Sequence, residues 1–192
     1  MTLRFESSEV RDLIFAWFAV ASVFIIAFSD PLDDPAGMLV WMIPAVFFVG
    51  LGVVVHELAH KYVGTLYGYH AVFIANRAFT IISVIAALAG LIILAPGAVH
   101  IMPAPPRRET AMIALAGPLS NLAICIACIL FGLLIPLFAF GALINAYLAV
   151  FNMLPIPGLD GHKVLSYSKP LAFGTLIVSA GLLAGSYMIF IS

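Results

Sequence analysis

The chain has 192 residues, of which 64% are hydrophobic and only 9% are charged, and its mean hydropathy is +1.19. These values lie far outside the composition of soluble globular proteins and indicate a polytopic membrane protein with no room for a separate soluble domain of ordinary size. The net charge of -1 points to no particular partner. The eight Lys and Arg residues form no basic stripe, so that nothing favours nucleic acid as a partner.

The first part of the chain contains two apolar runs separated by an acidic loop. Residues 13–29 are just long enough to cross the hydrocarbon of a bilayer, and residues 38–64 form a second, longer span. The loop between them, residues 30–35, carries three Asp and two Pro and should face outward. Acidic residues dilute the positive charge before the first run, so we expect a retained span rather than a cleaved signal peptide.

The second span carries a His-Glu-x-x-His motif formed by His56, Glu57 and His60. On a helix, residues four apart stand one turn above each other, so that His56 and His60 can direct their imidazoles at one metal ion. Glu57 follows the first ligand and can take a proton from an activated water, as the general base of a zinc protease does. Ionisable side chains inside an apolar helix are costly and therefore mark a functional site.

The apolar run that follows is not expected to cross the membrane. Residues 79–95 are apolar but end at a Pro-Gly pair, and residues 98–102 have strand-like character. We therefore expect residues 79–102 to form a re-entrant or β-hairpin membrane segment, with its polar backbone covered by protein or lining a wet cavity.

Three further apolar runs complete the chain. Residues 111–135 contain Asn121 in their first half, residues 138–154 cross back and run into a stretch rich in Pro and Gly over 152–161, and residues 170–191 form the last span. Cys125 and Cys128 lie in an apolar run, where we expect them to pack as small residues rather than to bind metal.

Asp160 is the best candidate for a third metal ligand, because two His and one Asp leave the fourth position of a tetrahedral zinc site for water. The histidines and Asp160 lie at the ends of their spans, so that the two helices must run in the same direction, with an odd number of crossings between them. Five crossings with the N-terminus inside also put the basic residues on the cytoplasmic face. Glu109 is a rival third ligand.

Asn121 and Asn152 place amides inside apolar helices. One interpretation is that these amides hold a substrate strand or stabilise the oxyanion that forms as water attacks a peptide carbonyl. The other is that they form hydrogen bonds between helices and serve only to hold the bundle together. The residues alone leave both interpretations open.

Taken together, three motifs resemble the signatures of the site-2 protease family of intramembrane zinc metalloproteases. They are the His-Glu-Leu-Ala-His motif at 56–60, the Gly-Pro-Leu-Ser-Asn stretch at 117–121, and residues 152–161 with Asn152 and Asp160. The resemblance implies zinc held by His56, His60 and Asp160, Glu57 as general base, and Asn121 and Asn152 as site-lining residues. It also implies a transmembrane helix of a membrane-anchored protein as substrate and regulated intramembrane proteolysis as function.

These observations predict an all-α polytopic membrane protein with about five to six transmembrane helices and the re-entrant segment between the first two core helices. We expect one membrane-embedded metalloprotease domain over residues 1–192. Its catalytic core would be formed by 38–64, 111–135 and 138–161, with 13–29 and 170–191 as peripheral spans. The protein is expected in the cell membrane, in contact with lipid, with the site inside the bilayer near the cytoplasmic face. The alternative is a catalytically silent metal-binding carrier or sensor.

Overall fold

A computed structural model describes residues 3–29, 36–94, 96–132 and 134–191. The predicted acidic loop, residues 30–35, lies outside these residues. The described chain is mostly helical and divides into two compact units, one formed mainly by residues 55–71 and 101–192 and the other by residues 4–54 and 72–100. The expectation of a single domain stays a prediction.

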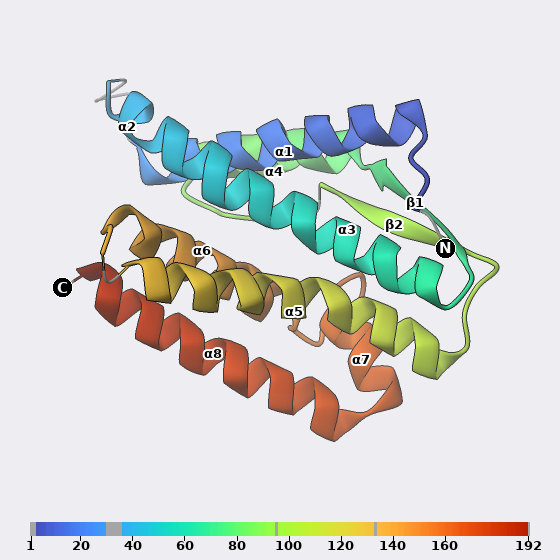
Figure 1. The fold of residues 1–192 in the computed structure, drawn as a ribbon. Helices are drawn as coiled ribbons and strands as arrows, with labels where there is room; N and C mark the ends of the chain where they lie inside the picture. The colour runs from blue at the N-terminus through green and yellow to red at the C-terminus, as the bar shows by residue number, and fades with distance from the viewer. Residues whose placement is uncertain (1–2, 30–35, 95, 133, 192) are drawn as a thin grey trace. The chain divides into compact units, whose positions relative to one another are not determined.

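The first unit contains the C-terminal part of α3 (Leu51–Leu66) and four further helices (Figure 1). These helices are α5 (Arg107–Gly132), α6 (Leu137–Asn152), α7 (Asp160–Tyr167) and α8 (Lys169–Ile191). Helix α5 packs on α6 and α7, and α8 packs on α6 and α7. A small apolar core between α5, α7 and α8 includes Ala114, Val164 and Ala172. Cys125 and Cys128 are buried free thiols, as their apolar surroundings predicted.

The second unit contains α1 (Ser7–Phe28), α2 (Gly37–Pro44), a π-helical turn over Ala45–Gly50, α4 (Arg77–Leu88) and most of a two-stranded sheet. Its strands are β1 (His70–Ala75) and β2 (Gly97–Met102). The π-helical turn follows Pro44, which lacks the backbone donor that a regular α-helix needs. The Trp17 indole donates to the carbonyl of Val46 in this turn at 2.7 Å, and thereby ties α1 to it.

The expected all-α polytopic membrane fold is confirmed. Within the described residues, four helices are long and apolar enough to cross a membrane: Ser7–Phe28, Gly37–Leu66, Arg107–Gly132 and Lys169–Ile191. Helix α6 has 16 residues, which is about 24 Å of helix, so a fifth crossing there stays a prediction. Helix α4 has only 12 residues, and β2 occupies the segment with predicted strand character. The sequence did not predict β1.

Acidic side chains of α1 cover one edge of β1. The buried Glu9 carboxylate accepts from the backbone N–H of Phe73 at 3.0 Å, and Asp12 accepts from the N–H of Ala75, also at 3.0 Å. Residues 73 and 75 are two apart, so that both donors point to the same edge of the strand. An uncovered strand edge would present these donors to any other extended chain.

Candidate metal centre

His56, His60 and Asp160 come together in the first unit, although Asp160 follows the second histidine by 100 positions in the sequence. The Nε2 atoms of the two histidines lie 3.0 Å apart. Oδ2 of Asp160 lies 3.3 Å from Nε2 of His56 and 3.1 Å from Nε2 of His60. All three side chains are buried. This juxtaposition agrees with the expectation that the two distant motifs meet.

Both imidazoles form a hydrogen bond through Nδ1, the ring nitrogen that does not face Asp160. Nδ1 of His60 lies 2.7 Å from the carbonyl oxygen of Ile113, and Nδ1 of His56 lies 2.7 Å from Oδ1 of Asn121. Because these oxygens accept hydrogen bonds, each Nδ1 carries the proton and each Nε2 presents a lone pair. Hydrogen bonds of this kind, formed by the ring nitrogen that does not bind the metal, orient metal-bound histidines in many proteins.

The donor set fits a zinc ion. Two imidazole lone pairs and a carboxylate oxygen face one another at 3.0–3.3 Å, which is unfavourable for three acceptors unless a cation lies between them. Ligands at zinc distances of about 2.0–2.1 Å in a tetrahedral site are separated by about 3.3 Å. The three atoms therefore have the spacing and chemistry of three zinc ligands.

The second oxygen of Asp160 is held by a lysine that sequence analysis did not single out. Nζ of Lys163 donates to Oδ1 at 3.0 Å, one turn further along α7. Oδ2 is thereby left to face the histidines. Asp160 lies in the first turn of α7, where the helix N-terminus favours a negative charge. We had expected the carboxylate to end a span, but α6 ends at Asn152 and Asp160 begins a new short helix.

The remaining predicted site residues lie as follows. Glu57 is buried on α3 directly after the first histidine. Asn121 is fully buried and contacts His56, whereas Asn152 is half-buried and donates to the carbonyl of Leu148 in its own helix at 3.0 Å. Glu109, the rival ligand, accepts a hydrogen bond from the Tyr69 hydroxyl, which raises the pKa of that phenol. The catalytic roles given to Glu57, Asn121 and Asn152 stay predictions.

The helix Gly37–Leu66 is long and apolar enough to span a membrane and carries the His-Glu-x-x-His motif, and Asp160 lies next to both histidines. These residues are the ligand set of a zinc metalloprotease. The chain is 37% identical over 176 residues to a Methanocaldococcus jannaschii protein named "Putative zinc metalloprotease", and the match covers 86% of this chain and 87% of that protein. The chain belongs to this zinc metalloprotease family. No protein-family model matches it, and neither does any solved structure.

Proposed function

We propose that the protein is an intramembrane zinc metalloprotease of the site-2 type, which hydrolyses peptide bonds within or near a transmembrane helix of a membrane-anchored protein. The observation that carries this proposal is the position of His56 and His60 on the 30-residue apolar helix Gly37–Leu66. Met38 to His56 is eighteen steps, or about 27 Å of helix, so that the histidines would lie at membrane depth near the far side. We place that side at the cytoplasm of the cell membrane, because positive charge accumulates there.

His56, His60 and Asp160 would hold the zinc ion, which when bound supplies Lewis acidity toward a peptide carbonyl and toward water. Glu57 would accept the proton of the attacking water and later give it to the leaving amine. One interpretation of Asn121 and Asn152 is that their amides bind the substrate or the oxyanion. For Asn121, the contact with Nδ1 of His56 instead favours a role in orienting this histidine.

A substrate helix must unwind before a protease can cleave it, and β2 offers a partner for the unwound chain. In the described part of the chain β2 pairs with β1 alone, and Glu9 and Asp12 cover the opposite edge of β1. We propose that the extended substrate adds beside β2, whose residues alternate between exposed and half-buried.

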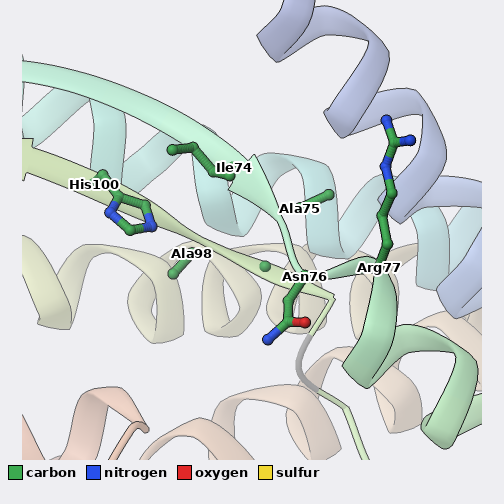
Figure 2. A pocket seen from close by; sticks show the side chains of 7 residues that line it. Ile74, Ala75, Asn76, Arg77, Ala98 and His100 are labelled. Atoms are coloured by element: carbon green, nitrogen blue, oxygen red, sulfur yellow. The ribbon is translucent and has the colours of Figure 1, made fainter.

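A pocket of 480 Å³ lies at one end of this sheet, next to Ala98 and His100 of β2 (Figure 2). Figure 2 shows Arg77 turned away toward α1, where it lies 3.4 Å from Asp12. Asn76 lines the pocket and accepts from the N–H of Phe79. The pocket would therefore receive side chains of the bound strand without offering them an unpaired arginine.

The test is cleavage of a single-helix substrate in liposomes. A tagged transmembrane helix containing an Asn-Pro pair is reconstituted with the wild-type protein or with Glu57→Gln, and the fragments are located by mass spectrometry. We expect wild-type protein to cut within the apolar segment, and Glu57→Gln to keep zinc but lose cleavage.

Cleavage by Glu57→Gln at the wild-type rate would contradict the assigned base. Bound zinc in the wild-type protein without cleavage of any helix in a panel of such substrates would favour the metal carrier or sensor. Cleavage of soluble casein alone would contradict the intramembrane site.

A further inference from the structure

We propose that Asn145 is a positioning residue of the metal centre, which acts through Asn121 on the orientation of His56. Helix α6 contributes no metal-ligand candidate among the described residues, yet Asn145 reaches the site through one intermediate side chain. Nδ2 of Asn121 donates to Oδ1 of Asn145 at 3.0 Å, and Nδ2 of Asn145 donates to the carbonyl of Gly141 at 3.0 Å. This inference rests on the proposed role of His56 as a metal ligand.

His56, Asn121, Asn145 and the Gly141 carbonyl form a relay of hydrogen bonds. The Gly141 carbonyl, at its far end, determines which way each amide of the relay is turned. The Gly141 oxygen can only accept, so that Asn145 must turn its NH2 group toward it and its oxygen toward Asn121. Asn121 must then present its own NH2 group to that oxygen, which leaves Oδ1 for His56. His56 must therefore carry its proton on Nδ1 and keep the Nε2 lone pair that a metal requires.

The burial of both amides makes the reversed orientation of either one unfavourable. Asn121 and Asn145 are both 0% exposed. Turning either amide around would set donor against donor or oxygen against oxygen where water cannot compensate, and each unsatisfied buried group costs about 1–3 kcal/mol. The relay therefore holds one tautomer of His56.

The two histidines are oriented by different means. His60 bonds directly to the backbone carbonyl of Ile113, which no substitution removes. His56 depends on two side chains, from α5 and α6, so that its orientation can be changed by mutation without changing any ligand. The two histidines thus provide an internal comparison.

The first measurement is the tautomer of both histidines in metal-free protein, by long-range 1H–15N correlation with 15N-labelled histidine. We expect His56 and His60 to carry the proton on Nδ1 in the wild-type protein. In Asn145→Leu, Asn121 loses the acceptor that fixes the direction of its amide, so His56 should shift toward a mixture of both tautomers while His60 stays unchanged. Neither result requires metal or proteolysis, so that this inference can fail independently of the proposed function.

The second measurement is zinc affinity in a double-mutant cycle. We expect Asn145→Leu and Asn121→Leu each to weaken zinc binding about 10–100-fold, and the double variant to bind no more weakly than Asn121→Leu, because Asn145 acts only through Asn121. Ser179→Ala is the matched control, since Ser179 is equally buried but bonds to Thr175 of its own helix.

Three results would overturn the inference. They are an Nε2 proton on His56 in the wild-type protein, an unchanged tautomer with zinc affinity within twofold of wild type in Asn145→Leu, or losses that multiply in the double variant. If Asn145→Leu does not fold, Asn145→Ser replaces it, because serine is polar but too short to span from Asn121 to Gly141. The wild-type tautomer needs no variant at all.

Discussion

Gly117 of α5 packs directly against the imidazole of His56. A Cβ atom at this glycine would lie 2.6 Å from Cε1 of His56, and it would also overlap the ring of His60. Contacts under 3 Å are essentially never seen for real Cβ atoms, so that the rings would have to move. The absence of a side chain at position 117 is what allows α5 to lie this close to both candidate ligands.

Gly117→Ala is therefore expected to lower zinc affinity by at least tenfold. In an ordinary helix the same change would favour the helix by about 0.8–1 kcal/mol, because alanine has the higher helix propensity. Here the displaced rings should break the spacing of the Nε2 atoms. Zinc per protein, measured by elemental analysis after dialysis against buffered zinc, checks the prediction.

The matched control is Gly174→Ala on α8, where a Cβ would meet nothing within 4 Å. This variant should bind zinc as wild type does. Equal zinc content in both variants would show that the site does not depend on the close approach of α5.

Asp160→Ala should remove most of the bound zinc, whereas Glu109→Ala should leave it in place. The structure puts an Asp160 oxygen within 3.3 Å of both imidazoles, and Glu109 is hydrogen-bonded to Tyr69. Loss of one of three protein ligands removes a large share of the binding free energy of a zinc site. The opposite ranking of the two variants would reinstate a glutamate as the third ligand.

The histidine pair and its carboxylate could be predicted from sequence because the histidines are local neighbours and the chemistry of zinc requires a third ligand. His56 and His60 are one turn apart on any helix, and Asp160 was the carboxylate that would complete a zinc site of two His and one Asp. Asn145 could not be predicted in the same way. It is an amide in an apolar run, and its partner lies 24 residues away on another helix, a distance for which no periodicity gives a signal. The only local indication was its spacing of seven residues from Asn152, which puts both amides on the same face of one helix.

Strand β1 was missed for a related reason. The strand has only six residues, and the donors along one of its edges are satisfied by Glu9 and Asp12, more than sixty residues earlier. Sequence analysis treated these two acids only as charges near the N-terminus. Their role depends on tertiary contacts that local propensity does not include.

Glu9→Ala should lower the free energy of unfolding by about 1–3 kcal/mol, because it leaves the buried N–H of Phe73 without this acceptor. Hydrogen exchange at the Phe73 amide should accelerate accordingly, and mass spectrometry of the peptide containing β1 can follow it. Glu6→Ala is the control, since Glu6 is exposed on the same segment and should leave the exchange of β1 unchanged. Equal protection in Glu9→Ala and wild type would mean that α1 does not cover the strand edge.

Removal of the metal ion should lower the stability of the first unit, and by more than removal of an ion bound at the protein surface would. Without a cation, two imidazole lone pairs and a carboxylate oxygen face one another in a buried site, with Lys163 compensating only the other oxygen. Zinc at 100 times its dissociation constant should stabilise the folded protein by about 2.7 kcal/mol relative to chelated protein. Thermal scans in detergent at one fixed rate should show a lower apparent unfolding temperature with chelator than without it, and where unfolding is irreversible this shift reports a change in unfolding rate. Asp160→Ala should show no such shift, because it lacks the third ligand. A shift of the same size in that variant would place the stabilising ion elsewhere in the protein.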